Sequence, residues 1–408
     1  MDTEDEYFNK LLSIITYDKP NTNYRKTKKF LYDDKVIYYN FNDYIELDEI
    51  LYRLFISIDK KNIFSNEFLQ KQLNLFLIDD NANDRTSTFK SFQNYLKTFV
   101  AHKYFVYAGL YGANIQTKTS LGKYLIVPKN ELFELVREYD TLLNGVTLTD
   151  EQINVFAFEE ADANTYIGIE IESFDDKHAC DIARMELLNF EKLMYFSCLR
   201  NGNRPPIRIF NLVNSSTSFL ILEKDNWSRR SSLNPLFVGT ANYTIETLIK
   251  EMEDNQSKFI FDLYSKQNRN DLESRIINAI LWMGQANIEE NSNVKLLEYC
   301  FALESLLQIR QGETISPSIT YQITRACAII IGENFTDRNK IIENLQSIYR
   351  LRSALAHGSS KTIDTYYNDL IWQYLIKLVY SLTYSKDWNQ LKSAQELWNK
   401  VESIMLLG

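Results

Sequence analysis

The feature of this 408-residue chain that most constrains its fold is a change of sequence pattern near residue 240. Before that point, helical patterns alternate with short segments rich in β-branched and aromatic residues, which are typical of strands. These strand-like segments are 35–41, 123–127, 166–171 and 207–210. After Tyr243 such segments vanish, and one amphipathic helical pattern follows another. The sequence therefore predicts an α+β region over 1–240, followed by an all-α helical bundle over 241–408.

Residues that end helices indicate where the helices of the second half lie. Glycine and the Ser-Pro pair end helical patterns, and they occur here at Gly312, Ser316-Pro317, Gly332 and Gly358. A helix start is predicted at Thr336-Asp337-Arg338, where polar capping residues precede an apolar repeat. The expected helices are 244–266, 269–288, 292–310, 317–333, 336–357, 361–385 and 387–406. In the first half, a helix is expected over 181–199, and the glycine- and proline-containing segment 201–206 interrupts the chain.

Composition excludes several classes of protein. A content of 45% hydrophobic and 24% charged residues is that of a soluble globular protein able to bury sizeable cores. The net charge of −9 argues against a protein that coats nucleic acid non-specifically, although an RNA-cleaving enzyme needs only a local basic pocket. The four cysteines lack C-x-x-C spacing, which favours reduced thiols over disulfides or a zinc site.

Targeting and cofactor motifs are missing as well. The N-terminal residues are acidic where a signal peptide would be basic and then apolar. No apolar run approaches the ~18 residues that span a bilayer. The sequence also lacks a glycine-rich phosphate loop, a nucleophile elbow and an H-E-x-x-H motif. We therefore expect a cytoplasmic protein that uses no membrane anchor, metal or cofactor.

The stretch from Tyr349 to Gly358 carries the most chemical information. It places Arg352 and His357 five positions apart at the predicted end of a long helix, and the chain has only 3 histidines. Histidine can move a proton near neutral pH, and arginine can neutralise charge that builds on a phosphate. Arginine and histidine together are therefore sufficient to cleave RNA without a metal ion.

Helix geometry places these two side chains on different faces. At 100° per residue, Arg352 falls inside an apolar stripe, and His357 lies about 140° away from it. The two would converge only if the last helical turn deviated, or if a second copy packed about a twofold axis. Ser353 lies one turn before His357 and could orient its ring. The apolar stripe consists of Ile341, Leu345, Ile348, Leu351 and Leu355.

Purely structural roles are open for the same residues. An arginine on an apolar stripe can extend its head to water or bind a glutamate on a neighbouring helix. A histidine beside a glycine can cap the last carbonyls of a helix. A pattern as short as Arg-x4-His also recurs by chance, so on its own it favours these structural roles.

The surrounding helices carry an ordered series of further residues. They are Ala302-Leu303-Glu304-Ser305-Leu306-Leu307, Arg325-Ala326, Asp337-Arg338, and the block from Tyr349 to Gly358. With this series the chain resembles the HEPN superfamily, and within it the ApeA-like branch of bacterial anti-phage proteins. The resemblance covers roughly residues 270–385, and the Tyr-x-x-Arg-Ser-x-x-x-His-Gly block is its most specific part.

The resemblance implies a metal-independent endoribonuclease that acts as a homodimer, with one composite cleft formed by both motif helices. Arg352 and His357 match the motif arginine and histidine, and Ser353 matches the polar residue after the arginine. The implied reaction is attack of a ribose 2′-hydroxyl on the adjacent phosphate, which leaves a 2′,3′-cyclic phosphate. Transfer RNA is one candidate substrate. Glu304 matches the glutamate of a neighbouring helix, and we interpret it as a structural partner for an arginine.

Further expectations concern substrate binding and regulation. Tyr349 and Arg350 are expected to flank the cleft, and Arg350, Arg352 and Lys340 are expected to make it locally positive. Residues 1–240 are expected to form a sensor or regulatory region without an active site of its own, and a phage-derived trigger would release the nuclease in abortive infection. The alternative function is an inactive HEPN-fold module for binding or interaction.

Overall fold

The computed structural model describes residues 4–16, 26–32, 35–41, 44–59, 63–79, 88–144, 149–150, 152–153, 163–198, 216–223, 226–233, 243–309, 319–358 and 362–407. The predicted strand 207–210 and the predicted break 201–206 lie outside these residues, as do Gly312 and Ser316-Pro317. Within the described residues, the fold is mixed α and β in the first half and helical in the second, as the sequence predicts.

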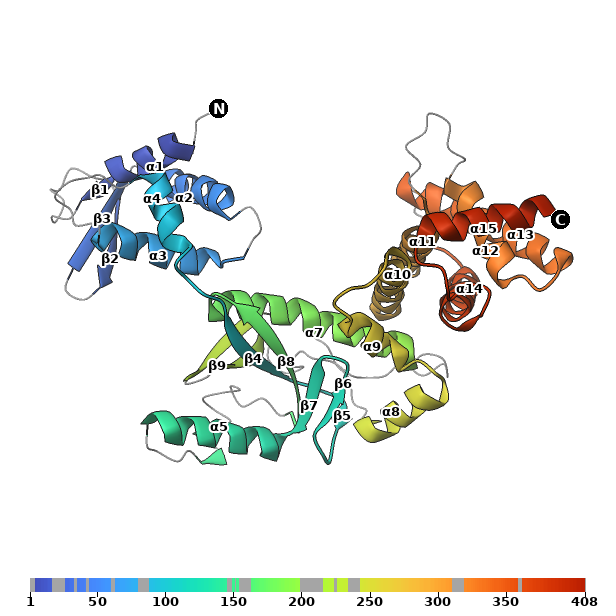
Figure 1. Cartoon of the computed structure of the whole chain (residues 1–408), viewed down its shortest axis with the longest axis horizontal. Coiled ribbons are helices and arrows are strands. Elements are labelled where there is room, and N and C mark those ends of the chain that lie inside the picture. The colour runs from blue at the N-terminus through green and yellow to red at the C-terminus, as the bar shows by residue number, and fades with distance from the viewer. Residues whose placement is uncertain are drawn as a thin grey trace.

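The first part of the chain forms a lobe with its own core, which we call the N-terminal lobe (residues 4–96). Its elements are α1 (Glu4–Ser13), β1 (Ile15–Thr16), β2 (Lys26–Tyr32), β3 (Lys35–Phe41), α2 (Tyr44–Ile58), α3 (Asn66–Asp79) and α4 (Phe89–Leu96). The three strands pair antiparallel in the order β1-β3-β2. The helices pack on this small sheet through a separate apolar cluster that includes Phe8, Leu54 and Phe92. Figure 1 shows this lobe in blue, set apart from the C-terminal helices.

A six-stranded sheet forms the centre of the molecule. Its strands are β4 (His102–Gly109), β6 (Thr119–Leu121), β7 (Tyr124–Pro128), β8 (Thr165–Ser173), β9 (Ser216–Glu223) and β10 (Asn226–Leu233). They pair antiparallel in the order β10-β9-β4-β8-β7-β6. A parallel pair of β5 (Ala113–Asn114) and β11 (Tyr243–Thr244) lies beside it.

Successive residues along a strand of this sheet have their side chains in two different cores. On β4, Tyr104, Val106 and Ala108 belong to the main hydrophobic cluster, which also contains residues of α7 (Asp176–Cys198). Tyr107 instead joins a smaller cluster with residues of α5 (Lys129–Asn144). This period-two pattern places α7 and α5 on opposite faces of the sheet.

The second half is helical throughout its described residues. Its helices are α8 (Ile245–Asp254), α9 (Phe259–Ser265), α10 (Asp271–Ile288), α11 (Ser292–Leu307), α12 (Ile319–Ile331), α13 (Phe335–Ala356), α14 (Thr365–Tyr384) and α15 (Ala394–Leu407). Most of them match the predicted segments to within a few residues. The prediction of one helix over 244–266 is wrong, because the chain breaks into α8 and α9. At the break the Asn255 side chain accepts a hydrogen bond from the Ser257 N–H (2.9 Å), and Gln256 adopts a φ of 58°.

The main hydrophobic cluster does not divide near residue 240. It runs without interruption from the sheet and α7 into the C-terminal helices. Gly284 of α10 lies so close to α7 that a Cβ at this position would be 2.2 Å from the Lys192 carbonyl oxygen. In Figure 1, α7 runs across the middle of the molecule toward α10. The change of sequence pattern therefore marks a change in element type, whereas the N-terminal lobe is the part with a separate core.

The four cysteines, Cys180, Cys198, Cys300 and Cys327, are all buried and free of disulfides. Burial raises the pKa of the Cys198 thiol to about 12, and it raises the pKa of Cys300 and Cys327 as well. These thiols pack as small apolar side chains. None of the described helices has the length and apolar character required to cross a bilayer.

Candidate active site

The Arg-His block occupies the end of α13, and the helix stays regular up to His357. The helix begins with Asn334, whose side chain accepts a hydrogen bond from the Asp337 N–H (3.0 Å). This N-cap lies just before the start predicted at Thr336. At the other end, the His357 N–H donates to the Ser353 carbonyl (3.1 Å). Gly358 then ends the helix with a φ of 87°, a conformation that glycine adopts without strain.

The predicted apolar stripe faces the interior of the bundle. Ile341, Leu345 and Ile348 are buried, and Leu351 and Leu355 are half-buried against the main cluster. Helix α13 packs mainly against α12, with further contacts to α11 and α14. The stripe is therefore used within a single chain, and the opposite face of the helix is left for solvent or a partner.

Tyr349 does not lie where the sequence analysis expects it. Its side chain is 7% exposed and belongs to the core, because position 349 widens the buried stripe beside Ile348. Its hydroxyl is enclosed and has no hydrogen-bond partner among the described residues. Burial raises the pKa of this hydroxyl well above its usual range. Tyr349 is therefore buried within the single chain, and its expected place beside a substrate cleft stays a prediction.

Arg352 lies at the edge of the stripe and pairs with Glu304 of α11. The distance is 3.3 Å from Arg352 Nε to Glu304 Oε1 and 3.5 Å from Nη2 to Oε2. The arginine side chain is 33% exposed and the glutamate side chain is 16% exposed. Burial raises the pKa of Glu304, although the neighbouring guanidinium opposes that change. The expectation that Glu304 serves as an arginine partner is confirmed.

The ion pair leaves one arginine donor unused. Arg352 Nε is enclosed and makes no hydrogen bond with acceptable geometry among the described residues, even though Glu304 Oε1 is near. The contact is thus an electrostatic attraction with a poorly aligned N–H group. An acceptor with better geometry would be favoured at this nitrogen.

The exposed face of the last turns carries the other candidate residues. Arg350, Ser353 and His357 are all exposed. Arg350 folds back along its own helix, with Nε donating to the Gln346 carbonyl (3.3 Å) and Nη2 to Ser347 Oγ (3.2 Å). Ser353 and His357 are four positions apart and so lie on the same face of the helix.

One copy of the helix does not bring Arg352 and His357 together on a common face. Since the backbone remains helical up to His357, the two side chains project about 140° apart. Lys340 is exposed, but it lies roughly 15 Å along the axis from Arg350 and about 80° around it. With Arg352 paired to Glu304, the unneutralised positive charge that α13 contributes near His357 comes from Arg350.

The other two histidines of the chain lie on β4 and α7. His102 Nδ1 is 3.5 Å from Glu223 Oε1, and the His178 backbone N–H donates to Asp175 Oδ1 (2.8 Å). Among the described residues, no group of three or more His, Cys, Asp or Glu side chains could hold a metal ion. Two further groups of arginines in the sequence could contact RNA phosphate, but they lie outside the described parts of the chain: Arg200, Arg204 and Arg208, and the side chains of Arg229 and Arg230.

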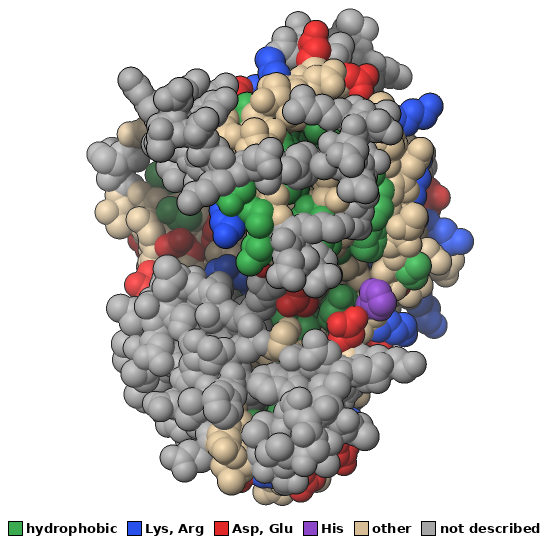
Figure 2. Space-filling view, turned by 90° about the vertical axis from the view of Figure 1, so that its left-hand side faces the viewer, with side chains coloured by type: hydrophobic (Ala, Val, Ile, Leu, Met, Phe, Trp, Pro, Cys, Tyr) green, Lys and Arg blue, Asp and Glu red, His purple; other side chains and the backbone are tan. Residues whose placement is uncertain are grey.

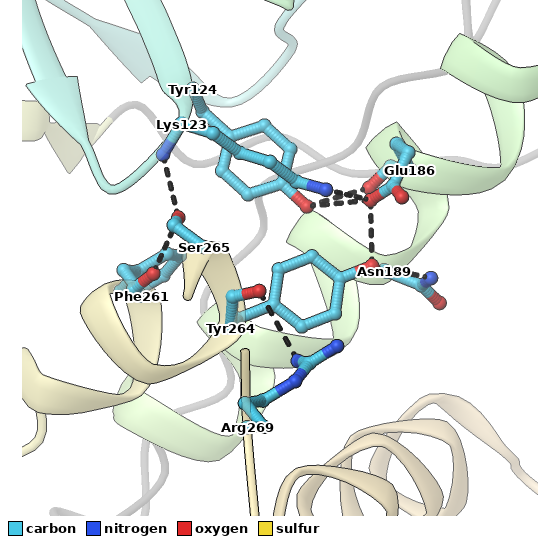
Figure 3. Close-up of polar contacts among 8 residues, drawn as sticks. All are labelled: Lys123, Tyr124, Glu186, Asn189, Phe261, Tyr264, Ser265 and Arg269. Atoms are coloured by element: carbon cyan, nitrogen blue, oxygen red, sulfur yellow. Dashed lines mark hydrogen bonds and ion pairs between the residues drawn. The ribbon is translucent and has the colours of Figure 1, made fainter. Parts of the chain in front are cut away.

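Sequence reasoning missed a polar network that joins β7, α7 and α9 (Figure 3). Glu186 of α7 lies at its centre: its Oε2 accepts a hydrogen bond from the Tyr264 hydroxyl (2.6 Å) and is 2.9 Å from Lys123 Nζ. The Tyr124 hydroxyl donates to the Glu186 carbonyl (3.0 Å). Burial raises the pKa of both tyrosines, so both stay protonated.

Cations on both sides of Tyr264 complete this network. Lys123 Nζ is 4.6 Å from the centre of the ring, and the Arg269 guanidinium is 5.6 Å from it. Figure 3 shows the ring lying between these two side chains. The contacts hold the β6–β7 hairpin and α9 against α7, which is a structural role. No sequence signal could have revealed the network, because its members are far apart in the chain.

Searches among known protein families, curated proteins and solved structures find no match for this chain. The resemblance of residues 270–385 to the HEPN superfamily therefore depends on the residues of the chain alone.

Proposed function

We propose that this protein is a HEPN-type RNA endonuclease that acts as a homodimer in abortive infection against phage. The observation that carries the proposal is the regular end of α13, which exposes His357 and holds Arg352 on a different face. Two groups that one helix keeps about 140° apart can serve the same phosphate if the second group comes from another copy. This need for two copies agrees with the composite cleft that the HEPN resemblance implies.

The proposed reaction uses a proton transfer and a charge stabilisation. His357 accepts the proton of a ribose 2′-hydroxyl, whose oxygen attacks the adjacent phosphorus. Arg352 stabilises the charge of the phosphorane. The 5′-oxygen of the next nucleotide leaves with this proton, which the same His357 returns to it, and a 2′,3′-cyclic phosphate remains. Ser353 orients the His357 ring, and Arg350 binds an RNA phosphate.

In the proposed nuclease, Glu304 and the RNA substrate compete for the guanidinium of Arg352. RNA must attract the guanidinium more strongly than this carboxylate does, or share it through the unused Nε donor. A phosphate is a strong competitor, because arginine binds it with two parallel hydrogen bonds. In this proposal Glu304 positions the arginine before substrate arrives.

The same ion pair favours a second candidate function, a HEPN-fold interaction module without catalysis. If Arg352 is present only to neutralise Glu304, and His357 only ends the helix, both residues are structural. The exposed face with Arg350, Ser353 and His357 would then contact a partner.

Cleavage of total tRNA by the purified protein in EDTA separates the two functions. The nuclease is expected to shorten tRNA and to leave cyclic phosphate ends that mass spectrometry detects. His357→Ala should abolish cleavage, and His102→Ala, which removes a histidine far from α13, should not. Intact tRNA after incubation with wild-type protein, in the presence and absence of phage lysate, would favour the interaction module. Sequencing of RNA ends from cells that express wild type and His357→Ala would identify the substrate.

A further inference from the structure

The face of the molecule drawn in Figure 2 carries charges of both signs. Among its described residues, acidic side chains in red and basic side chains in blue are interspersed, so this face does not point to an RNA-binding surface. The proposed site depends instead on Arg352, which already pairs with Glu304. RNA can use this arginine only if the protein stabilises Glu304 after the arginine has left.

Four side chains form a layer between α11 and α13. Cys300 and Glu304 lie four positions apart on α11, on the same face of that helix. Tyr349 and Arg352 lie three positions apart on α13 and also share a face. Cys300 is fully buried and Tyr349 is 7% exposed, whereas the ion pair of Glu304 and Arg352 lies at the edge of the bundle. The layer therefore runs from the core to the proposed site.

The Tyr349 hydroxyl lies near the other three groups of this layer. Burial, followed by the Cys300 thiol and the Glu304 carboxylate, raises the pKa of the hydroxyl, and the Arg352 guanidinium opposes that change. The pKa of the Cys300 thiol is raised by burial and then by Glu304, and Arg352 again opposes the change. Such effects require proximity, because the interaction of two charges weakens with distance. The hydroxyl thus keeps its proton beside a carboxylate.

Two enclosed polar atoms of this layer have no hydrogen-bond partner among the described residues. They are the Tyr349 hydroxyl and Arg352 Nε. A buried polar atom without a partner destabilises a fold. Glu304 is the carboxylate near both atoms, and Arg352 holds it, with 3.3 Å from Nε to Oε1 and 3.5 Å from Nη2 to Oε2. One carboxylate therefore has two neighbouring donor groups, and the tyrosine is the one left unused.

Glu304 needs a new partner whenever Arg352 turns away. Its side chain is 16% exposed, and a largely buried carboxylate that loses its counterion is costly. A tyrosine hydroxyl can compensate such a carboxylate through a charge-assisted hydrogen bond. The same chain contains an example, since the Tyr264 hydroxyl donates to Glu186 Oε2 (2.6 Å) in the network of Figure 3.

We propose that Tyr349 is a positioning residue, whose hydroxyl donates a hydrogen bond to Glu304 when Arg352 turns to an RNA phosphate. In the free protein, the carboxylate holds the arginine in place. In the RNA-bound protein, the tyrosine stabilises the carboxylate that the arginine has left, which lowers the cost of releasing the arginine. Tyr349 acts through Glu304, and direct contact with RNA is not part of this role. The inference rests on the proposed nuclease function.

Tyr349→Phe tests the exchange of partners in the absence of RNA. In the wild-type background it should leave the equilibrium constant of unfolding within about twofold, because the hydroxyl has no partner to lose. In the Arg352→Met background, where the guanidinium is gone, it should raise that constant about tenfold, because the hydroxyl now binds Glu304. Urea unfolding of the full chain measures both changes. Equal effects of Tyr349→Phe in the two backgrounds would overturn the proposal.

Tyr374→Phe is the matched control. Tyr374 of α14 is also buried, but its hydroxyl already accepts a hydrogen bond from Asn344 Nδ2 of α13 (2.7 Å). The control should therefore raise the equilibrium constant of unfolding by the same factor with and without Arg352→Met, since distant sites act additively. If the control depended on the background as Tyr349→Phe does, the effect would not be specific to Tyr349 and the proposal would fail.

Binding of a short 2′-O-methylated RNA of mixed sequence tests the RNA-bound state, because this RNA lacks the attacking hydroxyl and is not cleaved. Tyr349→Phe should bind it about tenfold more weakly than wild type, and Tyr374→Phe should bind it as wild type does. Equal affinities of wild type and Tyr349→Phe would overturn this inference alone. Failure of wild type to bind would overturn the proposed function as well. If Arg352→Met does not fold, the RNA comparison decides, since Tyr349→Phe removes a single oxygen atom.

Discussion

Glu304 of α11 and Arg352 of α13 form an ion pair with 3.3 Å between Oε1 and Nε, at the edge of the core and beneath the exposed face that carries His357. The pair explains how an arginine is tolerated on an apolar stripe, since a neighbouring carboxylate compensates its charge. It also makes Glu304 the residue that determines how available Arg352 is to an incoming phosphate.

Glu304→Gln is expected to lower the free energy of unfolding by roughly 1–2 kcal/mol, because Arg352 loses its charged partner in a partly exposed setting. The proposed nuclease should bind RNA more tightly in this variant, since the competing carboxylate is gone. Urea unfolding and RNA binding of the double mutant Glu304→Gln/Arg352→Gln complete a double-mutant cycle. A coupling energy near zero in that cycle would contradict the structural importance of the pair.

Glu298 is expected to make the protein less stable as the pH rises. Burial, followed by the neighbouring Glu289, raises the pKa of Glu298 to about 7 against the opposing charges of Lys192 and Lys295. The folded state therefore retains this proton between about pH 4.5 and 7, where the unfolded chain has released it. For a carboxyl group with a raised pKa, the stabilisation is present below that window and is lost as the pH rises through it.

Glu298→Gln should remove this pH dependence. Thermal unfolding should show the variant more stable than wild type at pH 8 and close to wild type at pH 5. Glu273→Gln provides the opposite case, because a hydrogen bond from Lys266 and the N–H of Asn270 lower the pKa of Glu273. That variant should be less stable than wild type at pH 8. If both variants changed the unfolding temperature by the same amount at both pH values, the pKa directions given for Glu298 and Glu273 would be refuted.

Complementation between two inactive variants tests the composite cleft. Arg352→Ala and His357→Ala should each be inactive alone. Mixed after mild dissociation, they should regain part of the RNA cleavage, because a mixed dimer combines His357 of one chain with Arg352 of the other. If one chain supplied both groups of each active site, the mixture would stay inactive. Light scattering of the two variants checks that both still form dimers.

Two glycines should respond very differently to alanine. Gly358→Ala meets no atom within 4 Å, so its cost comes only from the φ of 87° and should be roughly 1 kcal/mol. Gly284→Ala would place a methyl group 2.2 Å from the Lys192 carbonyl oxygen, and its cost should reach roughly 3 kcal/mol or more. Chemical denaturation measures both. Similar small costs would mean that α7 and α10 separate easily.

The sequence predicted those parts of the fold that depend on local pattern. Helices α10, α11 and α13 follow the predicted ranges closely because each has its own amphipathic spacing and end signals. The break at Asn255 was missed because contacts from distant elements support it: Asn255 Nδ2 donates to the Ser197 carbonyl of α7, and Tyr380 donates to the Asn255 carbonyl. Tertiary contacts of this kind override local propensity.

In the candidate site, too, some features follow from local sequence pattern and others from tertiary contacts. The positions of Arg352 and His357 on one helix could be predicted, as could the glutamate partner of the arginine. The burial of Tyr349 could not, because the width of the stripe depends on how α11 and α12 pack against α13. A cavity between the N-terminal lobe and the central sheet could not be predicted for a similar reason, since Tyr104, Glu223 and Glu67, which line it, come together only through the fold.

The separate core of the N-terminal lobe changes how truncation should be used to test regulation. A fragment that begins near residue 242 loses α7 and the sheet, which share the main hydrophobic cluster with the C-terminal helices. This fragment would expose the face of α10 that packs on Lys192 and its neighbours. It should therefore aggregate, or unfold at a lower temperature than the full chain does. A fragment that begins at Thr98 removes only the lobe and its own cluster. It should unfold cooperatively, with some loss of stability because Phe174 loses its contact with Phe64.

Growth assays with these two fragments then test restraint of the nuclease. If the lobe restrains the proposed nuclease, the chain from Thr98 should inhibit cell growth more than the full chain does, and His357→Ala in the same fragment should remove the difference. The fragment from residue 242 should be harmless because it does not fold. Equal toxicity of the full chain and the fragment from Thr98 would argue against restraint. A folded but inactive fragment from Thr98 would instead assign the lobe to substrate delivery, since the main core and the α13 site are retained without it.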